Sequence, residues 1–79
     1  MTIVVYSKSG CAECMFTKKF LEAEDFPFEE KRVNLNENHL EEVQLLGYRS
    51  LPVIKINEDE TFTGYQPERL EKLMSKWQN

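Results

Sequence analysis

The chain has 79 residues, enough for one domain spanning residues 1–79 with a small core. Fourteen acidic against ten basic side chains give a net charge of −4, which argues against nucleic acid as the main partner because phosphate binding needs a clustered positive face. We find no apolar run that could span a bilayer and no secretory leader. We therefore expect a cytoplasmic protein without a membrane partner, in a compartment where structural disulfides are rare.

The first half of the chain reads as strand, helix and strand. Residues 2–6, beginning with Thr2, are β-branched, aromatic and apolar on both faces, which is typical of a central strand. From Ala12 to about Glu24 the spacing of apolar residues predicts an amphipathic helix. Its predicted buried face carries Phe16, Phe20 and Ala23, with Thr17 and Leu21 beside them. Residues 28–34 are rich in charge, which suits an edge strand.

The second half reads as helix, hairpin and helix. Asn34 or Asn36 can cap a helix that ends near Gly47, and its predicted apolar stripe is Leu40, Val43 and Leu46. Residues 51–56 and 61–63 are short strands on either side of a polar turn, and they predict a hairpin. Pro67 suits the first position of the last helix. The apolar stripe of that helix is Leu70, Leu73, Met74 and Trp77.

The predicted order is therefore βαβαββα, which places the chain in the α/β class. The first strand–helix–strand unit requires a right-handed crossover between parallel strands. The hairpin adds antiparallel strands. We expect a four-stranded mixed sheet with helices on both faces.

Both cysteines of the chain, Cys11 and Cys14, lie at the junction between the first strand and the first helix. Unpaired N–H groups and the dipole at a helix N-terminus favour a thiolate there, and Lys8 adds a nearby positive charge. Cys11 is nearer the loop and is the predicted nucleophile, while Cys14 would resolve the mixed disulfide. This pattern predicts a thiol–disulfide oxidoreductase whose redox-active disulfide is Cys11–Cys14, with no other cofactor.

Three other uses of the cysteine pair stay open. A structural disulfide closing so short a loop would constrain the unfolded chain by only about 2 kcal/mol, and the cytosol would reduce it. The two cysteines could also be buried as small apolar side chains. Zinc needs four ligands, and the pair together with His39 does not complete such a site within one chain. A metal ion or an iron–sulfur cluster shared by two chains is thus an alternative function.

Four segments together resemble the glutaredoxin branch of the thioredoxin fold, and most closely its NrdH-type redoxins. They are Val5-Tyr6-Ser7-Lys8, the Cys-x-x-Cys pair with Thr17, Leu51-Pro52-Val53, and Gly64-Tyr65. The resemblance implies a thioredoxin/glutaredoxin-like fold in which Pro52 is a cis-proline facing the cysteines. Leu51 would offer its backbone to a bound substrate chain. The implied partners are thioredoxin reductase as electron donor and the large subunit of class Ib ribonucleotide reductase as acceptor, and we expect a monomer.

The electron donor depends on the stretch that follows the hairpin. Glutaredoxins that use glutathione typically carry Gly-Gly followed shortly by Asp. In this chain Tyr65 follows Gly64 and is too bulky for a close approach of a peptide backbone. Phe62 and Tyr65 instead suggest an apolar docking patch beside the cysteines, as in NrdH-type redoxins. Gln66 and Glu68 depart from the Arg and Asp of that pattern, so a glutathione-dependent glutaredoxin remains the alternative.

Overall fold

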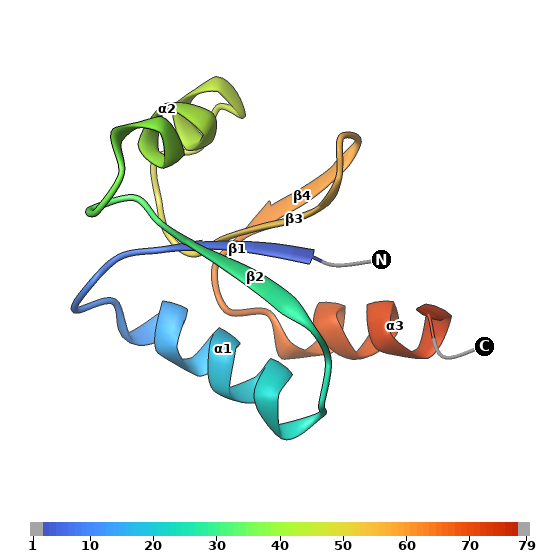
Figure 1. The fold of residues 1–79 in the computed structure, drawn as a ribbon. Helices are drawn as coiled ribbons and strands as arrows, with labels where there is room; N and C mark the ends of the chain where they lie inside the picture. The colour runs from blue at the N-terminus through green and yellow to red at the C-terminus, as the bar shows by residue number, and fades with distance from the viewer. Residues whose placement is uncertain (1–2, 78–79) are drawn as a thin grey trace.

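Seven elements follow one another in the predicted order βαβαββα (Figure 1). The structure is a computed structural model that describes residues 3–77, the last of them through its backbone only. The elements are β1 (Ile3–Ser7), α1 (Ala12–Ala23), β2 (Phe28–Arg32), α2 (Glu37–Leu45), β3 (Val53–Asn57), β4 (Glu60–Thr63) and α3 (Pro67–Trp77). Thr2 and the side chain of Trp77, for which we predicted a strand and an apolar stripe, lie outside the described residues.

The four strands form one mixed sheet in the order β2-β1-β3-β4. The strands β1 and β2 are parallel, while β3 pairs antiparallel with both β1 and β4. This confirms β1 as a central strand, β2 as an edge strand and the predicted hairpin, whose first strand begins at Val53 rather than at Leu51. Figure 1 shows α1 and α3 on one side of the sheet and α2 on the other. The predicted α/β architecture with helices on both faces is therefore confirmed.

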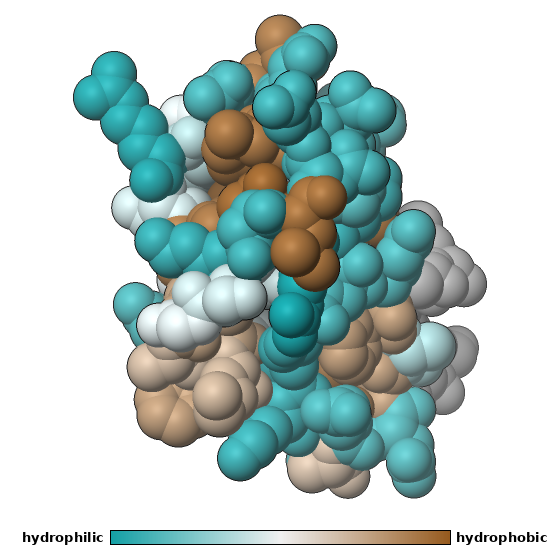
Figure 2. Space-filling view, turned by 60° about the vertical axis from the view of Figure 1, so that its left-hand side comes forward, coloured by the Kyte–Doolittle hydropathy of each residue, from teal (hydrophilic) through white to brown (hydrophobic). Residues whose placement is uncertain are grey.

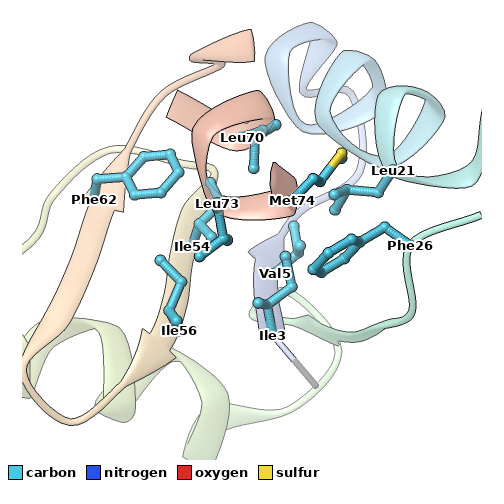
Figure 3. Packing of buried hydrophobic residues seen from close by; sticks show 10 residues of the cluster. All are labelled: Ile3, Val5, Leu21, Phe26, Ile54, Ile56, Phe62, Leu70, Leu73 and Met74. Atoms are coloured by element: carbon cyan, nitrogen blue, oxygen red, sulfur yellow. The ribbon is translucent and has the colours of Figure 1, made fainter. Parts of the chain in front are cut away.

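The main core lies between the sheet and the pair α1 and α3 (Figure 3). It consists of Ile3, Val5, Leu21, Phe26, Ile54, Ile56, Phe62, Leu70, Leu73 and Met74. A smaller cluster under α2 has three fully buried members, Tyr6, Val43 and Val53. The predicted stripe of α2 is only partly correct, because Leu40 is 42 % exposed. Part of the predicted apolar stripe of α2 therefore faces solvent.

The buried face of α1 differs from the predicted one. Its buried residues are Cys14, Thr17 and Leu21, while Phe16 is 52 % exposed and Ala23 is also exposed. The hydroxyl of Thr17 donates to the backbone carbonyl of Glu13 at 2.8 Å, so its burial leaves no polar group unsatisfied. Because the Cys14 and Thr17 side chains are small, the first turns of α1 can lie close to the sheet.

Two glutamates connect the helices to the sheet through polar contacts. The Glu30 carboxylate on β2 accepts from the Ser7 hydroxyl at 2.6 Å and from Lys18 Nζ of α1 at 2.7 Å. On the other face, Glu42 of α2 accepts from the Tyr6 hydroxyl at 2.7 Å and from Lys31 Nζ at 3.0 Å. These contacts hold the two helices at the ends of strands β1 and β2.

Burial and charge act on these groups in opposite directions. Burial, and then the Glu42 carboxylate, raise the pKa of Tyr6 far above its ordinary value. Burial also acts to raise the pKa of Glu30, but the hydrogen bonds from Lys18 and Ser7 outweigh it and the pKa is lowered. Donation from Tyr6 and then from Lys31 lowers the pKa of Glu42. Both carboxylates are therefore charged at neutral pH and phenolic Tyr6 is neutral.

In the part of the chain that the structure describes, no helix has both the length and the apolar character needed to cross a membrane.

Candidate active site

The cysteine pair lies where the carboxyl end of β1 passes into the N-terminus of α1. Gly10 has φ +76°, a conformation that favours glycine, and it turns the chain from the strand into the helix. Cys11 is the N-cap residue of α1, and its Sγ accepts from the backbone N–H of Cys14 at 3.2 Å. A helix N-terminus that donates to this sulfur favours its negatively charged form once the pair is reduced.

The two cysteines form a disulfide, with their Cα atoms 5.3 Å apart. Cys14 is 1 % exposed, whereas Cys11 is half-buried and lies at the surface of the loop. A partner can therefore reach Cys11 Sγ but not Cys14 Sγ. This difference fits the predicted roles, in which Cys11 attacks and Cys14 resolves.

The segment Leu51-Pro52 lies against the pair, as the resemblance implied. The peptide bond between these residues is cis, and the carbonyl oxygen of Leu51 is 3.8 Å from Cys11 Sγ. The carbonyl of Pro52 accepts from the backbone N–H of Gly64 and from the Thr63 hydroxyl, both at 2.9 Å. The end of β4 thus fixes the segment that faces the reacting sulfur.

Residues 64–65 form a third side of the site, joined directly to the helix that carries the cysteines. The backbone N–H of Tyr65 donates to the Glu13 carboxylate at 3.1 Å. The Tyr65 ring packs against the rings of Phe16 and Phe20, with centroids 5.8 and 6.4 Å away. This contact of Glu13 could not be predicted from the spacing of residues along the chain. The one feature of the sequence that pointed to a role for Glu13 is its position between the two cysteines, in the first turn of the helix.

Phe62, predicted to join Tyr65 in a docking patch, lies elsewhere. It is 4 % exposed in the main core, and the Arg69 guanidinium lies 4.6 Å from its ring centroid (Figure 3). The prediction that Phe62 contributes to the docking patch is therefore wrong, because alternate residues of β4 point to opposite faces and Phe62 points toward α3. The exposed apolar side chains next to the pair are instead Met15 and Phe16, each about half exposed.

Lys8 is exposed in the loop after β1 and has no hydrogen bond or ion pair with any residue in the described range. Its support of the Cys11 thiolate remains a prediction. The His39 ring lies against the β2–α2 connection, with Nδ1 3.3 Å from the Arg32 carbonyl. Among residues 3–76, no three Cys, His, Asp or Glu side chains gather in a way that could hold a metal ion.

The chain matches the family model named Glutaredoxin over residues 3–60. It is 35 % identical over 71 residues to the glutaredoxin-like protein NrdH of Lactococcus lactis, covering 90 % of this chain and 97 % of that protein. A solved structure of the NrdH-redoxin from Escherichia coli, described as having a thioredoxin-like activity profile, superposes with a TM-score of 0.83 at 32 % identity, covering 92 % and 95 % of the two chains.

A relative that is named for a small-molecule substrate is N-acetyl-S-hydroxy-L-cysteine reductase of Bacillus subtilis. It is 32 % identical over 74 residues, covering 92 % of this chain and 80 % of that protein. The similarity to these relatives thus extends over nearly the whole chain.

Proposed function

Because this chain belongs to the glutaredoxin family, and within it to the NrdH-type redoxins, we propose that it carries electrons from thioredoxin reductase to the large subunit of class Ib ribonucleotide reductase. Family membership and the cysteine pair make the chain a thiol–disulfide oxidoreductase; the two partners are the proposed step. The observation that carries the proposal is the Cys11–Cys14 disulfide, with Cys11 at the helix N-terminus beside Leu51. We further propose that the protein works as a monomer in the cytoplasm.

The reaction needs only the two thiols of the reduced protein. The Cys11 thiolate attacks one sulfur of the substrate disulfide, the substrate S–S bond breaks, and the released sulfur leaves as a thiolate that takes up a proton. Cys14 then loses its proton and attacks Cys11 Sγ, which releases the second substrate thiol and closes the Cys11–Cys14 bond. The substrate gains two electrons and two protons, and the protein ends in the oxidised form that the structure shows.

Three observations support thioredoxin reductase over glutathione as the electron donor. The backbone N–H of Tyr65 is already bonded to Glu13, so a ligand would have to displace a carboxylate to use it. The Tyr65 ring fills the space beside Phe16 and Phe20. Met15 and Phe16 offer exposed apolar surface next to the pair, which suits the docking of a protein partner.

The donor can be tested by following NADPH oxidation with insulin as disulfide substrate. One reaction contains thioredoxin reductase, and the other contains glutathione and glutathione reductase. We expect turnover with thioredoxin reductase and little with the glutathione system. Turnover with glutathione alone would refute the donor and would favour the alternative, a glutathione-dependent glutaredoxin.

The acceptor can be identified by covalent capture with the Cys14→Ser variant. Without the resolving thiol, Cys11 stays bonded to the substrate. In extract of the source cells, we expect the ribonucleotide reductase large subunit among the captured proteins, released by dithiothreitol. A Cys11→Ser, Cys14→Ser double variant is the matched control and should capture nothing. Absence of that subunit from the dithiothreitol-released proteins would contradict the acceptor.

A further inference from the structure

A pocket of about 350 Å³ lies between α2 and the loops that end β1, β2 and α2, and its lining includes Leu51, the neighbour of Cys11. Four apolar side chains line it, Val33, Leu40, Val43 and Leu51, while Lys8 and Arg49 stand at its rim. Figure 2 shows hydrophobic surface gathered at the height of α2 and of the loop before it, with polar side chains around it. Leu40 is 42 % exposed and Val43 is buried, so the pocket has an apolar floor that opens to solvent.

Leu51 joins this pocket to the reacting sulfur. Its side chain lines the pocket, while its carbonyl oxygen lies 3.8 Å from Cys11 Sγ. A partner segment that runs past Leu51 with its cysteine at Cys11 would therefore present a neighbouring side chain to the pocket. Side chains two residues apart in an extended segment share a face, about 6.6 Å apart along the chain, so the pocket residue should lie within about two positions of the target cysteine.

The charge at the rim differs from that of the whole chain. The protein carries a net charge of −4, yet Lys8 and Arg49 are both exposed and have no ion pair with a described residue. The nearby cations on β2 are already engaged, Lys31 with Glu42 and Arg32 with Glu30. The two rim cations are therefore available to a negatively charged partner, and the surrounding salt limits the repulsion from the rest of the surface.

A larger pocket of about 670 Å³ lies between β4 and α3, but nothing in its lining indicates what would bind there. Its lining does not include Leu51, and it mixes acidic Glu60 and Glu68 with basic Arg69 and Lys72. This pocket is not joined to the reacting sulfur through Leu51, and its charges are of both signs. Its lining therefore identifies no ligand.

We propose that the smaller pocket selects protein substrates whose target cysteine lies within about two residues of both a large apolar side chain and an acidic one. The apolar side chain enters the pocket, and the acidic side chain pairs with Arg49 and Lys8. This inference rests on the proposed function, because it assigns the kind of segment that the oxidoreductase reduces. The occupant is an extended segment of a protein; a small anionic thiol compound is an alternative that the test separates.

The test uses three synthetic peptides with the same disulfide and the same length. In the first, Leu and Glu flank the target cysteine; in the second, Gly replaces Leu; in the third, Lys replaces Glu. The protein is reduced beforehand and freed of reductant, so that the measured rate does not depend on the electron donor. We expect the first peptide to react roughly ten times faster than either of the others, which corresponds to ~1.4 kcal/mol.

Arg49→Glu tests the rim, and Lys19→Glu is the matched control. Lys19 is an exposed cation on α1 with no ion pair among the described residues, so its replacement makes the same change in net charge away from the pocket. We expect Arg49→Glu to invert the rate ratio between the Glu and Lys peptides, and Arg49→Gln to reduce that ratio towards one. Lys19→Glu should keep the wild-type ratio.

Each outcome decides a different claim. Equal rates for all three peptides, or an unchanged ratio in Arg49→Glu, would overturn the pocket proposal while leaving the proposed function intact. A wild-type protein that reduces neither the peptides nor insulin would instead refute the proposed function. If Leu and Gly peptides react alike and Arg49→Glu slows oxidised glutathione as much as the Glu peptide, the rim serves a small anionic thiol and the protein-segment proposal is wrong.

Discussion

Replacing Glu30 with Gln should weaken the attachment of the cysteine-bearing helix to the sheet. The carboxylate accepts from the Ser7 hydroxyl at 2.6 Å, from Lys18 Nζ of α1 at 2.7 Å and from Arg32 Nε at 3.4 Å. Ser7 is 1 % exposed and ends β1, directly before the loop that leads to the cysteines. Glutamine keeps the shape of the side chain but removes the negative charge that all three donors share.

The size of the effect follows from burial. Hydrogen bonds to a charged group contribute about 1.5–3 kcal/mol when shielded from water, whereas exposed ion pairs contribute about 0–1 kcal/mol. The Glu30 side chain is 27 % exposed and the Arg32 side chain 44 %, so water screens part of the network. The amide oxygen of Gln can still accept from Ser7. We therefore expect the free energy of unfolding to fall by about 1–2 kcal/mol at pH 7, a drop in Tm of about 4–16 °C.

The difference in the free energy of unfolding between wild type and Glu30→Gln should decrease as the pH falls. Burial acts to raise the pKa of Glu30, but the hydrogen bonds donated by Lys18 and Ser7 lower this pKa below the ordinary 4.5. A carboxyl whose pKa is lower in the folded than in the unfolded state stabilises the fold fully above the unfolded value and loses this contribution as pH falls through the folded value. The difference should thus be constant from pH 7 to about pH 5.5 and shrink below pH 4.5.

Urea unfolding of the oxidised protein, followed by circular dichroism between pH 3 and pH 7, measures this difference. Glu29→Gln is the matched control, because Glu29 is an exposed neighbour on β2 whose side chain has no hydrogen bond or ion pair with a described residue. It should lose less than about 0.5 kcal/mol. A Glu30→Gln penalty that is equal at pH 3 and pH 7, or no larger than that of Glu29→Gln, would refute the reasoning.

Three further substitutions test the site and the core. Cys11→Ser should abolish reduction of insulin by the pre-reduced protein, and residual turnover would show that Cys14 can attack alone. Leu70→Ala, at a fully buried position, should cost about 2–5 kcal/mol in urea unfolding, and a cost below 1 kcal/mol would contradict the described core. Asn36→Ala removes the cap that accepts from the Asn38 N–H at 2.9 Å and should cost about 1 kcal/mol, whereas a helix-surface control, Glu41→Ala, should cost less.

The local pattern of the sequence was sufficient to predict the helices and strands and the thiol–disulfide chemistry of the cysteine pair. Period-two and period-3.6 spacing, with Gly47 at φ +88° and Pro67 at the start of α3, set the boundaries of strands and helices through interactions within a few residues. The position of Cys11 and Cys14 at a strand-to-helix junction likewise depends only on neighbouring residues. The cis bond before Pro52 followed from the family resemblance, since no local rule requires it.

The tertiary structure alone decided which faces are covered and which distant groups meet. Spacing shows that Phe16 and Thr17 lie at adjacent angles on a helix, but only the position of the sheet buries Thr17 and leaves Phe16 against Tyr65. Phe62 lies in the core because α3 covers that side of β4. The bond from Tyr65 to Glu13 joins residues 52 positions apart, and no periodicity encodes such a contact. The sequence by itself therefore determined what the two sulfurs do, whereas the packing of separate elements decided what surrounds them.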